Sequence, residues 1–148
     1  MDQKQQDFYQ SLRDKVNKFV ESKKGRGYKW KEYLLLVPDM FHLLVKLTLD
    51  RRVDVKSKAI LGIAIAYFFA PIDLIPELFL GPLGLIDDLA VAAFALNKIM
   101  ASTDPAIIRG HWAGEDDILE KTQEIIQKAD EMMGSGLVRK IKNMMGAK

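Results

Sequence analysis

The 148-residue chain contains no cysteine, which excludes disulfide bonds, thiol nucleophiles and thiolate-bound metal ions. Histidine is almost as scarce: His42 and His111 are the two present, and neither has an identifiable serine partner for nucleophilic catalysis. No glycine-rich segment is followed by the Lys-Ser or Lys-Thr pair of a phosphate-binding loop. The sequence therefore gives no support to thiol redox chemistry, nucleophilic catalysis or nucleotide binding.

Lysine and arginine are absent from residues 59–97, although the chain carries 22 of them in total. The net charge is +6 over residues 1–58, −4 over residues 59–97 and zero over the remainder. A carboxylate among aliphatic neighbours is costly unless it caps a helix, finds hydrogen-bond donors or shifts its pKa. Four carboxylates lie in this apolar centre and need such an explanation: Asp73, Glu77, Asp87 and Asp88.

Apolar residues recur at helical spacing along most of the chain, and no segment keeps the strict alternation of a β-strand. The predicted fold is all-α, a small bundle of five or six helices around a central hydrophobic helical hairpin. We expect a single domain over residues 1–148, with a hairpin core at residues 56–100 and C-terminal amphipathic helices at residues 115–148. A first amphipathic helix of about five turns is expected to carry its apolar stripe at residues 8–20, and the other longer helices are expected over residues 30–49, 56–70, 85–100 and 118–133.

Glycines and prolines set the predicted helix boundaries. The first helix should end at the Gly25–Gly27 segment, and Pro38 should break or kink the second because proline lacks the backbone N–H. Pro71 should stop the third helix, leaving residues 72–81 to form at most a short helix. Asp104-Pro105 indicates an N-cap followed by proline in the first helical position.

Basic residues concentrate near both ends of the chain. The run from Lys23 to Lys31 is interleaved with glycine and matches no DNA-reading motif, so we expect an exposed loop and no nucleic-acid partner. Residues 137–148 set apolar side chains against lysine and arginine at helical spacing. Such a basic amphipathic segment either lies on anionic lipid or docks on the domain with its cations in water.

The hydropathy of residues 59–97 is compatible with two placements, a hairpin inserted in a membrane or a helix pair buried in a small bundle. Residues 59–70 give roughly 18 Å of apolar helix against a hydrocarbon core of about 30 Å, and a longer span would carry prolines and carboxylates through lipid. A membrane hairpin of residues 59–70 and 85–97 would keep its basic ends on the cytoplasmic side. The same pattern describes a buried helix pair in a small bundle, and the mean hydropathy of −0.04 is that of a soluble domain.

Two adjacent motifs give the chain a family resemblance. Residues 66–77 read Ala-Tyr-Phe-Phe-Ala-Pro-Ile-Asp-Leu-Ile-Pro-Glu, and residues 81–89 read Gly-Pro-Leu-Gly-Leu-Ile-Asp-Asp-Leu. This segment closely resembles the YkvA-like family, domain of unknown function 1232, with Ala70 where the family usually has serine and Glu77 where it usually has aspartate. The resemblance implies a small bacterial membrane-associated protein without an established activity. A related segment occurs in a RING-type ubiquitin ligase of the endoplasmic reticulum.

The four central carboxylates admit a structural interpretation, a metal-binding one, and a third in which they relay protons or dock a partner. In the structural one, Asp73 caps a short helix that Glu77 continues, while Asp87 and Asp88 lie in the first turn of the next helix and face its positive end. In the second, Asp73, Glu77 and one of Asp87 or Asp88 converge on Mg²⁺, Mn²⁺ or Ca²⁺, which prefer oxygen ligands; adjacent residues point about 100° apart on a helix, so Asp87 and Asp88 are not expected to join together. A divalent cation is the single cofactor the sequence suggests, and it suggests no catalytic residue.

We therefore expect a membrane-associated helical protein that acts as a non-enzymatic scaffold or interaction module at the cytoplasmic side of the cell membrane. Its expected partners are membrane lipid or a membrane protein, and a second copy of the chain is a further candidate. One alternative is a metal-dependent hydrolase-like enzyme that uses the clustered carboxylates. The other is a soluble helical adaptor in the cytoplasm. The sequence identifies no small-molecule substrate.

Overall fold

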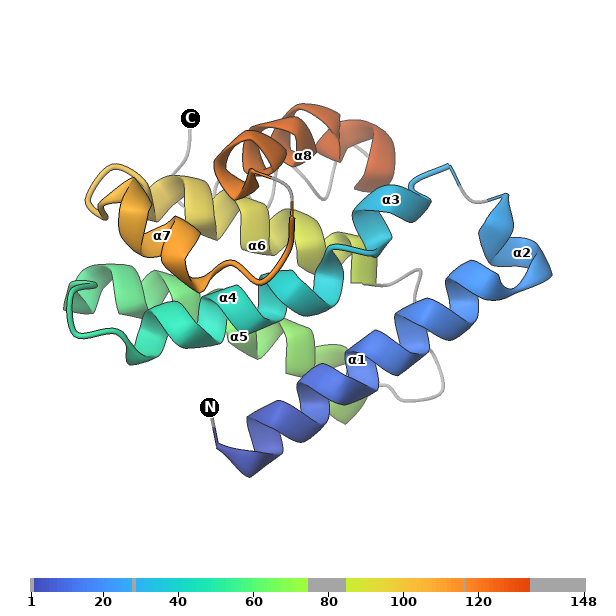
Figure 1. Ribbon diagram of the computed structural model, residues 1–148, viewed down its shortest axis with the longest axis horizontal. Helices are drawn as coiled ribbons and strands as arrows, with labels where there is room; N and C mark the ends of the chain where they lie inside the picture. The colour runs from blue at the N-terminus through green and yellow to red at the C-terminus, as the bar shows by residue number, and fades with distance from the viewer. Residues whose placement is uncertain (1, 28, 75–84, 116, 134–148) are drawn as a thin grey trace.

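A computed structural model describes residues 2–27, 29–74, 85–115 and 117–133, and within these ranges the chain is all-α, with no strand (Figure 1). Eight helical segments occur in the described residues, and six of them are longer than four residues. This confirms the predicted small helical bundle. The segments are α1 (Gln3–Glu21), α2 (Lys23–Arg26), α3 (Lys31–Leu34), α4 (Val37–Leu49), α5 (Val55–Leu74), α6 (Leu85–Ile99), α7 (Pro105–His111) and α8 (Ile118–Met133).

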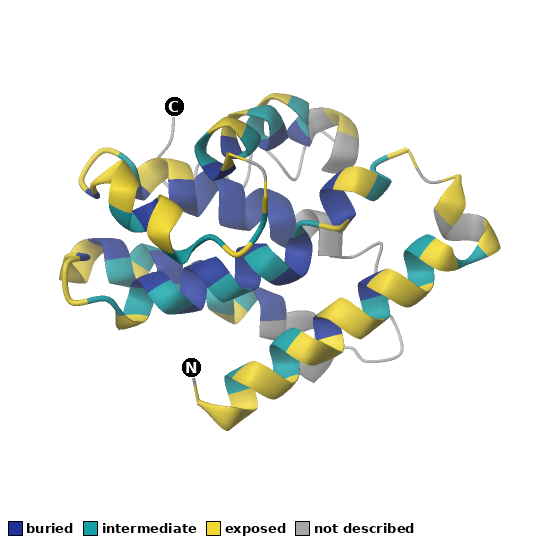
Figure 2. Cartoon of the chain, in the orientation of Figure 1, coloured by how far each residue is buried: buried dark blue, intermediate teal, exposed yellow. Residues whose placement is uncertain are grey.

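The core lies where α4, α5 and α6 pack against one another. The α5–α6 pair forms the predicted hydrophobic hairpin, α4 lies along both of its helices, α1 covers α4, and α8 covers α6. Figure 2 shows buried residues concentrated in α4 and α6, whereas α1 is exposed along much of its length. Phe41 on α4 joins the layers, because its ring packs edge-on against Phe8 of α1 at 4.9 Å and against Phe68 of α5 at 5.5 Å between centroids.

Two predicted boundaries in the N-terminal half need correction or adjustment. The prediction that α1 continues to Gly25–Gly27 was wrong, because α1 ends at Glu21 and a four-residue helix, α2, follows Ser22. Ser22 has an extended backbone and its hydroxyl donates to the carbonyl of Phe19, which closes the helix earlier. The predicted break near Pro38 is confirmed, but it falls between α3 and α4, so that Pro38 lies in the first turn of α4 where a missing N–H costs little.

The prediction that Pro71 stops the third helix was wrong, because α5 continues to Leu74. A proline removes one backbone hydrogen bond and disfavours a helix locally, but helical hydrogen bonds on either side of it can persist. The short helix predicted over residues 72–81 falls partly on α5 and otherwise outside the described residues. The last helix predicted after Gly136 also lies outside them.

Three C-terminal predictions are confirmed. The helix predicted over residues 85–100 is α6, and the one predicted over residues 118–133 is α8. Asp104 caps α7 by accepting a 2.9 Å hydrogen bond from the backbone N–H of Ala106, with Pro105 in the first helical position. Among the helices described here, none combines the length and the apolar character needed to cross a bilayer.

Candidate functional site

The structure describes the backbone positions of three of the four central carboxylates, Asp73, Asp87 and Asp88. Asp73 lies in the last turn of α5, and its side chain, together with Glu77 and the side chain of Asp87, falls outside the described residues. Asp87 and Asp88 are the third and fourth residues of α6, in the first turn as expected. The side chain of Asp88 is buried, with the residue 1% exposed. Within the described ranges, no three His, Asp or Glu side chains gather closely enough to hold a metal ion, so the metal site stays a prediction.

The outer face of α5 is apolar and exposed. Ile63 is 54% exposed and Val55 84%, and Ala59 and Ala66 on the same side of the helix are exposed as well. These residues share a face because they recur at spacings of three and four. A Cβ atom added at Gly62 would meet nothing within 4 Å, so this face is open.

Exposed cations lie at the N-terminal end of this face. Arg51 and Arg52 are in the loop before α5, Lys56 is in its first turn, and the exposed Leu49 ends α4. The hydroxyl groups of Ser57 and Ser102 lie 3.1 Å apart and connect the start of α5 to the loop between α6 and α7. We call the exposed residues of the loop and of the apolar face the α5 surface: Leu49, Arg51, Arg52, Val55, Lys56, Ala59, Ile63 and Ala66.

A cluster of Asp50, Arg52 and His111 borders the α5 surface. Oδ2 of Asp50 lies 2.7 Å from Nη2 of Arg52 and 2.7 Å from Nε2 of His111, and Nε of Arg52 donates to Oδ1 at 3.0 Å. The hydrogen bonds from Arg52, followed by the one from His111, hold the pKa of the Asp50 carboxyl well below its usual range. Because Asp50 follows α4 and His111 ends α7, the cluster also attaches α7 to α4.

A second polar cluster connects α1 to α4. The phenol of Tyr9 donates a 2.9 Å hydrogen bond to Oδ1 of Asp39, and the Arg13 guanidinium lies 5.6 Å from the centre of the Tyr9 ring. His42 packs beside this ring, and its buried Nδ1 has no hydrogen-bond partner among the described residues. Burial and then Lys46 lower the pKa of His42, so this side chain is disposed to remain neutral.

A third cluster connects α3 to α8 around Tyr33. Its phenol donates to Oε1 of Glu124 at 3.1 Å and accepts a 2.9 Å hydrogen bond from Nζ of Lys128, while Lys121 and Lys128 both lie within 6 Å of the ring centre. The hydrogen bond to Tyr33 raises the pKa of Lys128. Glu124, Lys121 and Lys128 each contact Tyr33 or one another. Such mutual pairing is typical of a cluster that holds two helices together.

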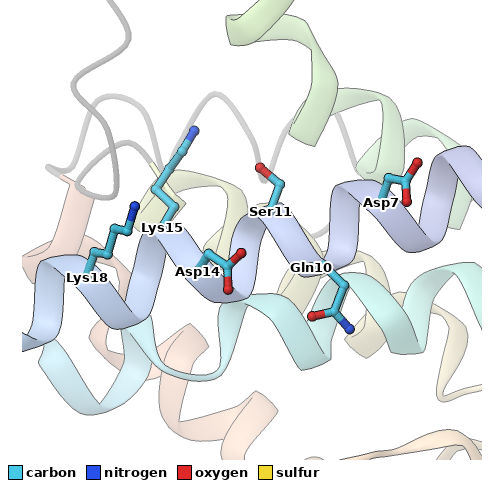
Figure 3. A pocket seen from close by; sticks show the side chains of 6 residues that line it. All are labelled: Asp7, Gln10, Ser11, Asp14, Lys15 and Lys18. Atoms are coloured by element: carbon cyan, nitrogen blue, oxygen red, sulfur yellow. The ribbon is translucent and has the colours of Figure 1, made fainter.

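The exposed side of α1 carries a hollow of about 480 Å³ lined by polar side chains (Figure 3). All six lining residues belong to α1 itself, and acidic and basic side chains are mixed along it. They are Asp7, Gln10, Ser11, Asp14, Lys15 and Lys18. This arrangement is typical of the water-exposed face of an amphipathic helix. Because the acidic and basic side chains are mixed, these six residues form neither an acidic nor a basic cluster.

The fold and these surfaces define a small all-α bundle in which α5 exposes an apolar face. Residues 57–94 of the chain match the family model described as "Protein of unknown function (DUF1232)". The predicted resemblance to the YkvA-like family is therefore confirmed over that segment, which begins in the first turns of α5 and ends within α6. No curated protein and no solved structure gives a significant match to the chain.

Sequence reasoning missed two features of the site. The first is the Asp50–Arg52–His111 cluster, because 61 residues separate Asp50 from His111 and no local motif links them. The second is the exposed face of α5. The segment is apolar all round, so its sequence pattern does not distinguish the buried side from the open one.

Proposed function

We propose that the protein is a non-enzymatic helical scaffold that docks on the anionic surface of a membrane, at its cytoplasmic side, through the α5 surface. The observation that carries this proposal is the pairing of an open apolar face with cations at one end. Interfacial binding combines burial of apolar side chains at the headgroup boundary with attraction to anionic lipids, and it needs no helix long enough to span the bilayer.

The apolar side chains supply the first contribution. Exposed large aliphatic residues are normal when scattered singly, but Val55 and Ile63 lie on one helix face with Ala59 and Ala66 between or beside them. No charged residue occurs from Ala59 to Tyr67, so this face can enter the acyl boundary without burying a charge. Leu49, 57% exposed at the end of α4, adds an apolar side chain beside the cations.

The cations supply the second contribution. Arg51 and Lys56 are exposed at the end of the face that would lie nearest the phosphate groups of the lipid, and Arg52 beside them is exposed but paired with Asp50. Each lysine or arginine close to an anionic leaflet contributes about 1 kcal/mol of attraction at low screening. Asp54 in the same loop offsets part of this charge, because the 2.7 Å hydrogen bond from Ser57 N lowers the pKa of its exposed carboxyl and keeps it ionised.

A second copy of the chain is the less suitable occupant of this face. Residues 55–66 give a strip roughly 18 Å long and about 10 Å wide. Stable protein–protein interfaces bury about 800 Å² on each partner, several times the area of such a strip. A lipid surface has no minimum area of this kind and also accounts for the cations, so it is the partner that the α5 surface suits best.

Flotation with vesicles tests the proposal. The full chain is expected to float with vesicles of phosphatidylcholine mixed with phosphatidylglycerol, and much less with phosphatidylcholine alone. Ile63→Glu should abolish flotation because it places a charge in the apolar face, whereas Leu35→Glu, at a residue 42% exposed on another side of the bundle, is the matched control and should leave it unchanged.

Substitution of a cation separates the two contributions. Arg51→Gln should weaken binding to the mixed vesicles about fivefold, the equivalent of about 1 kcal/mol. Lys18→Gln, which removes an exposed cation from α1, should change it much less. Absence of flotation with either vesicle would refute the proposal. Elution as an oligomer that Ile63→Glu dissociates would assign the face to a second copy instead.

A further inference from the structure

Asp50 shares its single negative charge between two basic side chains. Oδ2 lies 2.7 Å from both Arg52 Nη2 and His111 Nε2, while Oδ1 accepts hydrogen bonds from the backbone N–H and from Nε of Arg52 at 2.8 and 3.0 Å. The Asp50 side chain is 8% exposed and that of His111 is 25% exposed, so water screens this cluster less than it screens an open ion pair.

The charge of this cluster depends on His111. When the imidazole is neutral, Asp50 and Arg52 cancel and the cluster is electrically neutral. When His111 carries a proton, one carboxylate faces two cations, and the cluster has a net charge of +1. Arg52 belongs to the α5 surface, so this additional charge appears at the edge of the proposed lipid contact.

We propose that protonation of His111 strengthens docking of the α5 surface on anionic lipid, so that the protein binds membranes more tightly at mildly acidic pH. This inference rests on the proposed function and adds that pH regulates the membrane docking. Histidine is suited to the role because its ionisation ordinarily falls between pH 5 and 8. The ligand class is unchanged: an anionic phospholipid surface.

The other charged groups near His111 do not supply the same response. On α4, His42 acts on it electrostatically, but burial lowers the pKa of His42, so that His42 takes up its proton less readily. On α7 itself Arg109 pairs with Asp117, which precedes α8, at 3.7 Å, and Asp104 acts on Arg52. Carboxylates and guanidinium groups ordinarily keep their charge between about pH 5.5 and 8. Comparison of His111→Gln with His42→Gln therefore assigns a pH response to one of the two histidines.

The expected effect is about fivefold in vesicle affinity, the value of one added cation near an anionic leaflet. The experiment measures binding of the full chain to vesicles of phosphatidylcholine and phosphatidylglycerol at about pH 5.5 and about pH 8, which span most of the range in which histidine side chains ordinarily change charge. The wild-type ratio of affinities should be about five, and it should diminish as salt is added because salt screens surface charge.

Two variants assign the effect to the cluster. His111→Gln keeps a hydrogen-bonding side chain but cannot be charged, so its affinity should be the same at both pH values and equal to that of the wild type at pH 8. Asp50→Asn removes the compensating carboxylate and should bind more tightly than the wild type at pH 8. His42→Gln is the matched histidine control and should retain the wild-type pH ratio. Circular dichroism verifies that each variant is folded at both pH values.

The outcomes are distinct. A wild-type ratio near five that His111→Gln abolishes and His42→Gln retains supports the inference, and if His111→Gln does not fold, the same loss of the ratio in His111→Asn supports it. Binding that is the same at both pH values, or a pH ratio that His111→Gln retains, overturns the inference and leaves the proposed function intact. Absence of binding to anionic vesicles at either pH overturns both.

Discussion

Tyr9 of α1 donates a 2.9 Å hydrogen bond from its phenol to Oδ1 of Asp39 on α4, 30 residues further along the chain. Burial, followed by this hydrogen bond and the charge of Asp39, raises the pKa of the Tyr9 phenol. The contact adds a polar attachment to the apolar packing of Leu12 and Val16, which are the buried residues of α1.

Tyr9→Phe is expected to lower the free energy of unfolding by about 0.5–1.5 kcal/mol, the net value of a typical intramolecular hydrogen bond. The urea midpoint measures this loss, and Gln10→Ala, at an exposed position of the same helix, should leave it almost unchanged. Because the folded-state pKa of Tyr9 lies above its ordinary value of 10.0, its contribution is complete below that pH and is lost as pH rises further. Equal urea midpoints for the wild type and Tyr9→Phe at neutral pH would contradict this account.

Asp50→Asn is expected to destabilise the fold at neutral pH, because it removes the acceptor shared by Arg52 and His111. The pKa of Asp50 is depressed, so its contribution is complete above the ordinary value of 3.8 and is lost as pH falls below that value toward the folded-state pKa. Urea midpoints of the wild type and the variant should therefore differ at pH 7 and converge in strong acid. A constant difference across the whole range would contradict the assigned cause.

Phe41→Ala is expected to cost about 3–5 kcal/mol, because it empties the space between α1, α4 and α5. Its ring contacts both Phe8 and Phe68, so no single neighbouring helix can fill the cavity by a small shift. Denaturant unfolding measures the loss. Ile63→Ala is the control on the open face of α5 and should change stability by less than about 0.5 kcal/mol. A loss at Ile63 comparable to that at Phe41 would show that the outer face of α5 is covered.

The predicted divalent-cation site has its own test. If Asp73, Glu77 and Asp87 or Asp88 hold a hard cation, calorimetry should detect binding of Mn²⁺ or Ca²⁺ that Asp73→Asn abolishes. Asp39→Asn, at a carboxylate outside this set, is the control and should bind the ion as the wild type does. Heat that is absent, or that persists in Asp73→Asn, would remove the metal-dependent enzyme from consideration.

The helical fold could be predicted from sequence because its signals are local. Pro38 indicated the break before α4, and Asp104 with Pro105 indicated the start of α7, since a cap and a missing N–H act within a single turn. The end of α5 was predicted too early because a proline costs about 3 kcal/mol in an isolated helix, and tertiary packing can offset a cost of that size.

The candidate site could be predicted only in part. The position of Asp87 and Asp88 in the first turn of α6 followed from the turn residues before Leu85. By contrast, the contacts of Asp50 with His111 and of Tyr33 with Lys128 depend on how α4 meets α7 and how α3 meets α8. Such pairings are long-range consequences of packing, and neither the spacing nor the composition of the chain encodes them in a readable pattern.

Site-specific fluorescence tests the central claim, docking of the α5 surface on lipid, most directly. Because the chain has no cysteine, Ile63→Cys and Leu35→Cys can each be labelled at one position with an environment-sensitive dye. On addition of vesicles of phosphatidylcholine and phosphatidylglycerol, the account predicts a blue shift of emission for the dye at position 63 and none at position 35. An unchanged spectrum at position 63, or equal shifts at both positions, would contradict it.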